Sequence, residues 1–179
     1  MRPLVVHDPL AEFLGASADG RIEYRYVDAV KLAGHSCPAV AAAYWMTLKA
    51  LAALYPAALP QRGGIRVDFR EDRLSGVTGV IANVVSMLTG ATQDGGFKGI
   101  GGRFDRRDLL YFSAGVTEEI RFTRMDNNES VEVAAQLQRV PFAPGTPELM
   151  RKCLDGRATP DEAARFRDNW QARVRSLLL

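Results

Sequence analysis

The segment from Pro38 to Tyr55 constrains the fold more than any other part of the chain. The spacing of its apolar residues predicts one long helix, which ends before Pro56 and Pro60. A wide face of this helix is apolar, and alanine dominates the remainder. Because such a helix is buried on several sides, other elements must pack against more than one of its faces. The wide face consists of Val40, Ala41, Tyr44, Trp45, Leu48, Leu51, Ala52 and Tyr55.

Shorter elements are predicted on both sides of this helix. Alternation of apolar and charged residues predicts half-buried strands over 21–27 and 65–70. Further strands are predicted over 109–114, 118–125 and 131–137, the first two joined near Gly115. Asp8 and Pro9 match the N-cap and first position of a short helix, and a second helix runs from about residue 75 to Gly90. Residues 93–102 hold five of the 16 glycines and predict an irregular loop.

The C-terminal part of the chain predicts helices. One helix begins near Thr146, and a second begins at Thr159, where Glu162 completes a capping box. Pro141 and Pro144 separate these helices from the preceding segments. We therefore predict two parts, a body of mixed helices and strands over residues 1–140 and a helical extension over residues 141–179.

Composition excludes several classes of protein. A chain of 179 residues with 47% hydrophobic content is long and apolar enough to fold as one domain. The net charge of +2 provides no electrostatic footprint for nucleic acid. No segment approaches the roughly 18 apolar residues of a membrane span, and the apolar run at the N-terminus is too short for a signal peptide. Two cysteines are too few for a disulfide scaffold, so we expect a cytoplasmic protein. From the charge and the lack of a long apolar segment, we expect neither a nucleic-acid nor a membrane partner.

The segment Gly34-His35-Ser36-Cys37-Pro38 concentrates the reactive chemistry of the chain. Pro38 suits the first position of the long helix, which makes Cys37 its N-cap. Unpaired backbone N–H groups and the helix dipole both favour a thiolate there, the form that binds metals or attacks electrophiles. The imidazole of His35 can reach the same point. The alternative is structural, because a free cysteine often behaves as a small buried hydrophobe.

The same segment, followed by a small-residue helix that contains Tyr44, resembles the signature of the FmdE-like family, whose members are related to a component of formylmethanofuran dehydrogenase. The resemblance runs from about Val27 to Leu137 and includes Glu71-Asp72, Ser75-Gly76-Val77, Leu88-Thr89-Gly90 and Phe97-Lys98-Gly99. It implies an α+β fold in which an antiparallel sheet packs with helices, and a homodimer. It also implies a divalent transition metal, commonly zinc, bound by His35 and Cys37.

The resemblance does not identify the metal ligands beyond His35 and Cys37. Many members carry a cysteine where Ser75 stands, and a hydroxyl is a poor zinc ligand. Some members end in a cysteine-rich zinc ribbon, which we do not expect here because Cys153 is the one cysteine after residue 140. We expect Cys153 to pack in a tail helix. His7 is a further candidate ligand, although an ordinary surface histidine is the simpler interpretation. Iron or nickel would also suit such ligands.

The glycine-rich loop is a candidate ligand-binding element. It matches neither a P-loop nor a dinucleotide-binding loop. It is either a flexible connection or a lining of the metal site, where Lys98 or Arg103 would hold an anionic group and Ser75 would border the same pocket.

The sequence thus leaves three functions open. The first is a metal-binding protein that acts on, or carries, a small anionic molecule or cofactor. The second is a metal-free enzyme with Cys37 as nucleophile and His35 as base. The third is an accessory subunit of an oxidoreductase complex.

Overall fold

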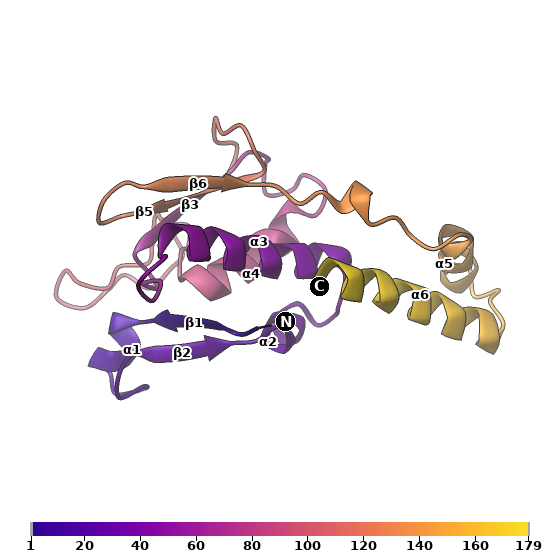
Figure 1. Ribbon diagram of the computed structural model, residues 1–179, viewed down its shortest axis with the longest axis horizontal. Helices are drawn as coiled ribbons and strands as arrows, with labels where there is room; N and C mark the ends of the chain where they lie inside the picture. The colour runs from indigo at the N-terminus through magenta and orange to yellow at the C-terminus, as the bar shows by residue number, and fades with distance from the viewer. Residues whose placement is uncertain (1, 179) are drawn as a thin grey trace.

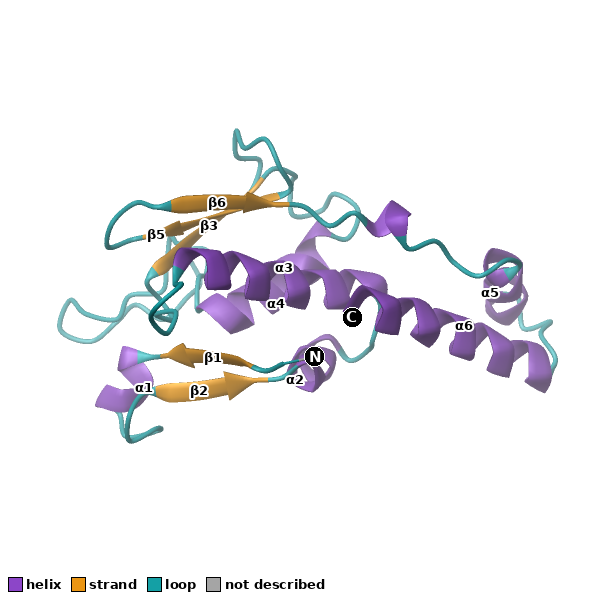
Figure 2. Ribbon diagram, viewed as in Figure 1, coloured by secondary structure: helices purple, strands orange, loops and turns teal. Residues whose placement is uncertain are grey.

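The computed structural model describes residues 2–178, in which helices and two sheets form an α+β fold (Figures 1 and 2). The strands are β1 (Leu4–His7), β2 (Arg21–Tyr24), β3 (Ile65–Phe69), β4 (Leu110–Tyr111), β5 (Ile120–Arg124) and β6 (Ser130–Val133). The α-helices are α1 (Pro9–Phe13), α2 (Tyr26–Ala33), α3 (Pro38–Leu54), α4 (Thr78–Thr89), α5 (Thr146–Leu154) and α6 (Pro160–Leu178). The predicted fold class is therefore confirmed.

Helix α3 is the centre of the core, as its composition predicts. It lies with α4 between the larger sheet and the antiparallel hairpin of β1 and β2 (Figure 1). Most of its residues are buried, on more than one face. Tyr44 is fully buried, and its hydroxyl donates a hydrogen bond of 2.9 Å to the carbonyl of Tyr24. This bond connects the hairpin to the central helix.

The larger sheet has the strand order β4-β3-β5-β6. Strands β3, β5 and β6 are antiparallel neighbours, which agrees with the predicted antiparallel sheet. The predicted strand over 109–114 is shorter than expected and pairs with β3 in parallel. Asp108 and Ser113 both have a φ of 54°, a left-handed conformation that interrupts an extended chain on either side of β4. Strand β3 therefore separates β4 from β5, although these two follow each other in sequence.

Helix α2 is an element that the sequence pattern conceals. The alternation over 21–27 predicts one strand, but the strand ends at Tyr24 and the helix begins at Tyr26. The carboxylate of Asp28 accepts a hydrogen bond of 2.8 Å from the backbone N–H of Arg25, which satisfies a donor at the helix start. Gly34 ends α2 with a φ of 72° and turns the chain toward α3.

Helices α3 and α4 both begin at the same end of the molecule. Both run antiparallel to β3. Helix α3 ends where the chain leads into β3, and α4 runs back from the end of β3 to Gly90. There the backbone N–H of Gly63, just before β3, donates to the carbonyl of Thr89. We call the end where both helices begin the Cys37 end, and the end where both finish the Gly63 end. A helix of 17 residues separates the two by about 25 Å.

The C-terminal helices extend from the Cys37 end (Figure 1). Helix α5 packs against α6, and the later part of α6 packs against α3. The capping box at the start of α6 is present: the backbone N–H of Thr159 donates to Glu162, and that of Glu162 donates to the Thr159 hydroxyl. The division between residues 140 and 141 remains a prediction. Among residues 2–178, no helix is both long and apolar enough to cross a membrane.

Candidate functional site

His35 and Cys37 lie two residues apart at the start of α3. Cys37 is the N-cap and Pro38 the first helical residue, as predicted, and within the described chain the Cys37 side chain makes no capping hydrogen bond. Nδ1 of His35 lies 2.9 Å from the carbonyl oxygen of Ala33. Because a carbonyl only accepts, Nδ1 carries a proton in this bond, and in the neutral imidazole Nε2 then keeps its lone pair. His35 is exposed, whereas Cys37 is half-buried and packs against the hydrophobic core.

Three side chains outside this segment hold its backbone in place. The indole N–H of Trp170 and the amide of Gln171, both on α6, donate to the carbonyl of Ser36 at 3.0 and 3.1 Å. The Ser36 hydroxyl donates to Gln171 and lies 2.9 Å from the Tyr26 hydroxyl. The Ser36 hydroxyl gives its one proton to Gln171, so the Tyr26 hydroxyl donates in this pair, and burial raises the pKa of Tyr26 above its ordinary value. Sequence reasoning missed all three residues, which lie 10 or more positions from Ser36.

The described residues form no complete metal site. Across residues 2–178, no group of three or more His, Cys, Asp or Glu side chains could hold a metal ion together. The donor types fit a transition metal, because an imidazole with its second nitrogen anchored and an uncapped thiol are ordinary ligands. A closed four-ligand site is absent from this part of the chain.

Ser75 lies at the Cys37 end, in the turn before α4. It is exposed, and its hydroxyl donates a long hydrogen bond of 3.4 Å to Glu71. Its role in ligand binding remains a prediction.

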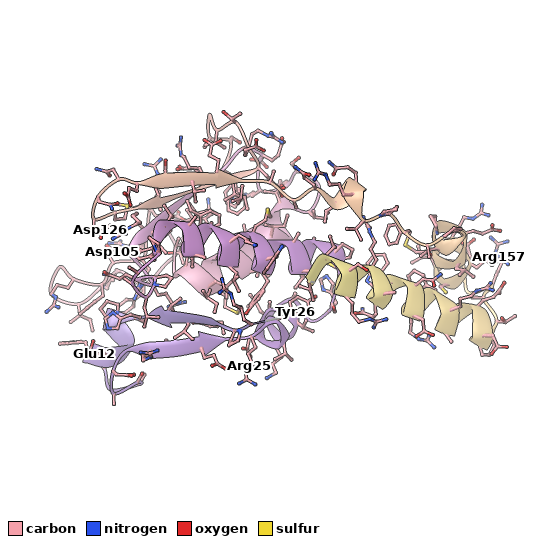
Figure 3. All side chains as sticks on the ribbon, viewed as in Figure 1. Glu12, Arg25, Tyr26, Asp105, Asp126 and Arg157 are labelled. Atoms are coloured by element: carbon pink, nitrogen blue, oxygen red, sulfur yellow. The ribbon has the colours of Figure 1, made fainter. Side chains whose placement is uncertain are left out.

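His7 lies at the Gly63 end, away from His35 and Cys37. It ends β1, and its Nε2 is 3.0 Å from a carboxylate oxygen of Glu12. Figure 3 shows Glu12 at one end of the hairpin and Tyr26 at the other. The structure therefore does not bring His7 together with the other two candidate ligands.

The glycine-rich loop also lies at the Gly63 end. Thr92 and Arg106 close it through a backbone hydrogen bond of 3.0 Å, and the ring of Phe104 packs on that of Phe13 in the segment after β1. Lys98 is exposed, whereas Arg103 borders a pocket. The loop therefore does not line the start of α3, where we expected it, because its ends follow α4 and precede β4 at the other end of the helices.

A cluster of three charged residues lies at the Gly63 end, with Asp8 and Arg106 buried and Arg62 half-buried. Asp8 accepts a hydrogen bond of 2.8 Å from Arg62 through one oxygen and one of 2.7 Å from Arg106 through the other. Asp8 is 3% exposed and Arg106 is 5% exposed. The remaining nitrogens of Arg106, Nε and Nη1, are buried and have no hydrogen-bond partner among residues 2–178.

The protonation of this cluster follows from its surroundings. Burial alone would raise the pKa of Asp8, but the hydrogen bond from Arg62, the charge of Arg106 and a backbone N–H of α1 outweigh it and lower that pKa below its ordinary value. Burial lowers the pKa of Arg106, and the attraction of Asp8 offsets only part of this effect. The cluster therefore carries two cations and one anion.

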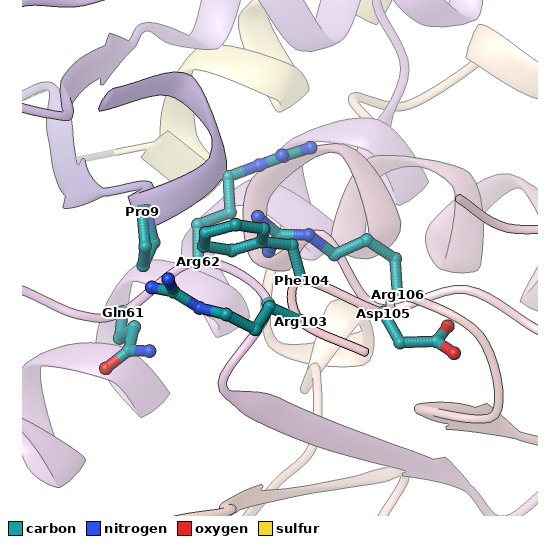
Figure 4. A pocket seen from close by; sticks show the side chains of 8 residues that line it. Pro9, Gln61, Arg62, Arg103, Phe104, Asp105 and Arg106 are labelled. Carbon is teal, nitrogen blue, oxygen red and sulfur yellow. The ribbon is translucent and has the colours of Figure 1, made fainter. Parts of the chain in front are cut away.

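A pocket of about 330 Å³ opens beside this cluster (Figure 4). We call it the arginine pocket, lined by Pro9, Gln61, Arg62, Gly63, Arg103, Phe104, Asp105 and Arg106. Figure 4 shows the Asp105 carboxylate directed away from the three guanidinium groups. Hydrogen bonds from Arg107 lower the pKa of Asp105 to about 2. The negative charge of Asp105 is thus engaged by Arg107 and does not neutralise the pocket.

Sequence comparison covers the candidate metal ligands and most of the fold. A family model described as "FmdE, Molybdenum formylmethanofuran dehydrogenase operon" matches residues 32–179. The match begins after Val27 and continues beyond Leu137, so it includes α5 and α6, which we expected to lie outside the resemblance. No curated protein and no solved structure matches the chain. Since the family model spans most of the sequence, the chain belongs to the FmdE family.

Proposed function

We propose that this FmdE family protein binds a divalent transition metal, with zinc as the expected ion, through Nε2 of His35 and Sγ of Cys37. The observation that carries the proposal is the 2.9 Å hydrogen bond from Nδ1 of His35 to Ala33, which leaves Nε2 as the free nitrogen two residues before an uncapped cysteine. Metal-binding histidines commonly anchor their second nitrogen in this way.

The remaining coordination positions are taken by water, by a small anionic molecule, or by a second copy of the chain in a homodimer. The absence of a third ligand within residues 2–178 supports an open site rather than a closed structural one. A metal in an open site supplies Lewis-acid chemistry or holds a ligand for transfer. The α6 contacts to Ser36 keep the two protein ligands in position.

The chain offers matched controls for a test of metal binding, because it has two histidines and two cysteines. Metal content of the purified protein is measured by elemental analysis, with about one equivalent expected. His35→Ala and Cys37→Ser should each lower metal occupancy about tenfold or more under dialysis. His7→Ala and Cys153→Ser should keep it. Equal metal content in Cys37→Ser and the unmodified protein would contradict the proposal.

Alkylation of the same protein distinguishes metal binding by Cys37 from a metal-free enzyme in which Cys37 is the nucleophile. No hydrogen bond joins His35 to Cys37 in the described structure, although a nucleophile and its base need one. If Cys37 binds metal, alkylation by iodoacetamide at neutral pH should be slow and should become faster after chelation. Fast alkylation that a chelator does not change would favour the nucleophile instead.

The family description supports a second candidate, a role as an accessory protein of an enzyme related to formylmethanofuran dehydrogenase. This role is compatible with metal binding, because an accessory protein can carry a metal or a small ligand. Affinity purification from native extract tests it: co-purification of a molybdenum enzyme would support the role, and recovery of the chain alone would argue against it.

A further inference from the structure

Arg62 and Arg106 share a single buried carboxylate, that of Asp8. The cluster therefore has an excess of one positive charge in a place where Arg106 is 5% exposed. Burial of an unbalanced charge is unfavourable, and a buried donor without a partner adds to the cost. Arg106 has two such donors, Nε and Nη1, among the residues that the structure describes. An oxyanion in an adjoining cavity would balance the charge.

The surroundings of Arg106 leave room for its guanidinium group. A Cβ atom at Gly63 would overlap Nη1 of Arg106, and one at Gly90 would come within 2.9 Å of it. Gly63 has a φ of 82°, a conformation that glycine adopts at no cost. The two glycines thus admit the arginine side chain to the wall of the pocket.

The arginine pocket has the size and charge for a small anion. Its volume of about 330 Å³ lies at the lower end of the range for small-molecule pockets. Arg62 and Arg106 form its inner wall, and Arg103 lies on its exposed rim over the ring of Phe104. Asp105, the one acidic side chain among the described lining residues, is bound to Arg107. A second cavity of about 510 Å³ borders the same two inner arginines.

We propose that the arginine pocket is an anion-binding site that takes the carboxylate or phosphate group of a small molecule. Arg62 and the buried Arg106 provide the positive charge, and Arg103 closes over the ligand from the rim. This site is separate from the proposed metal site, since α3 lies between them with its start at one and its end near the other. The inference therefore goes beyond the proposed function and does not depend on it.

The competing explanation is that the cluster only attaches the β1–β2 hairpin to the body of the protein. Asp8→Asn separates the two. Asparagine keeps the N-cap oxygen that accepts from Leu10 and Ala11, but it removes the negative charge between the two arginines. If the cluster is purely structural, Asp8→Asn should destabilise the protein, and anions should stabilise the variant no more than they stabilise the unmodified protein. An anion site would gain a stronger response, because the added anion replaces the missing charge.

The first experiment is a titration of ¹⁵N-labelled protein with inorganic phosphate and, separately, with acetate and succinate, at constant ionic strength set by sodium chloride. We expect saturable shifts at the Gly63 amide and the Arg106 Nε–H. Arg103→Ala should weaken binding about three- to tenfold, whereas Arg73→Ala, which removes an exposed arginine at the Cys37 end, should change affinity less than about twofold. Shifts that do not saturate, or affinity unchanged by Arg103→Ala, would overturn the proposal. Preference for phosphate over the carboxylates, or the reverse, identifies the ligand class.

The second experiment measures thermal unfolding with and without the best of these probes. The probe should raise the Tm of Asp8→Asn by more than it raises the Tm of the unmodified protein. An equal rise in both would contradict the proposal, and if Asp8→Asn does not fold, the Arg103→Ala titration decides. The shifts at the Gly63 amide and the Arg106 Nε–H should be the same in protein treated with a metal chelator, which keeps failure of this site distinguishable from failure of the metal site.

Discussion

Gly63→Ala should destabilise the protein more than an ordinary glycine substitution. The added methyl group would occupy space that the guanidinium of Arg106 fills. Arginine ends are flexible, but this one is enclosed between Gly63 and Gly90 and donates to Asp8 at 2.7 Å. The side chain therefore cannot move aside without breaking that bond.

Three contributions set the size of the effect. The φ of 82° costs a residue with a side chain about 1–2 kcal/mol. Insertion of a methyl group into a packed site costs about 1–3 kcal/mol, and loss of a buried ion pair about 3–5 kcal/mol. The last two are alternatives, since either the methyl or the guanidinium has to yield. We expect the free energy of unfolding to fall by about 4 kcal/mol, or the Tm by about 8–16 °C for a chain of this length.

Urea denaturation followed by circular dichroism measures the change, with Gly156→Ala as the control. Gly156 has a φ of 67° and open space where a Cβ would lie, so its substitution carries the conformational cost alone. The difference between the two variants isolates the effect of Arg106. If Gly63→Ala costs no more than Gly156→Ala, Arg106 is not held against Gly63 and the argument for a built pocket fails.

Three further predictions follow from the same contacts. Because the pKa of Asp8 is lowered in the folded protein, its contribution to stability is complete above its ordinary pKa of 3.8 and is lost as the pH falls through the folded value. In urea melts between pH 6 and about pH 2, the free energy of unfolding should fall more steeply with pH in the unmodified protein than in Asp8→Asn. Trp170→Ala removes a hydrogen bond to Ser36 and should lower both the Tm and the metal occupancy at His35 and Cys37, and elemental analysis showing full occupancy would contradict the positioning role of α6. We also predict a homodimer with two-fold symmetry, which light scattering would refute by a monomer mass that does not change with protein concentration.

Local signals in the sequence predict several elements correctly. Cys37 with Pro38, and Asp8 with Pro9, mark helix starts that the structure confirms. These signals work because a cap satisfies backbone N–H groups within three residues of itself. The alternation over 65–70 predicts β3, since a half-buried strand has a period of two, but Asp68 on the opposite face is buried as well.

Other elements depend on contacts that local patterns do not contain. The alternation over 21–27 continues past the end of β2, and only the hydrogen bond from Arg25 to Asp28 shows that a helix has begun. Strand β4 is limited to two residues by left-handed conformations at Asp108 and Ser113, neither of which is a glycine. Sequence patterns report such positions poorly, because non-glycine residues adopt this conformation only where their surroundings compensate for it.

The sequence by itself determined the central helix, the α+β class and the pair of candidate metal ligands. His35 and Cys37 are two residues apart, so their proximity follows from the chain itself. Tertiary structure alone decided where the anion-binding candidates meet. Asp8 lies 54 positions from Arg62 and 98 from Arg106, and only the packing of the hairpin against the ends of α3 and α4 brings them together. The same packing puts the glycine-rich loop at the Gly63 end, because both ends of that loop are hydrogen-bonded beyond the end of α4.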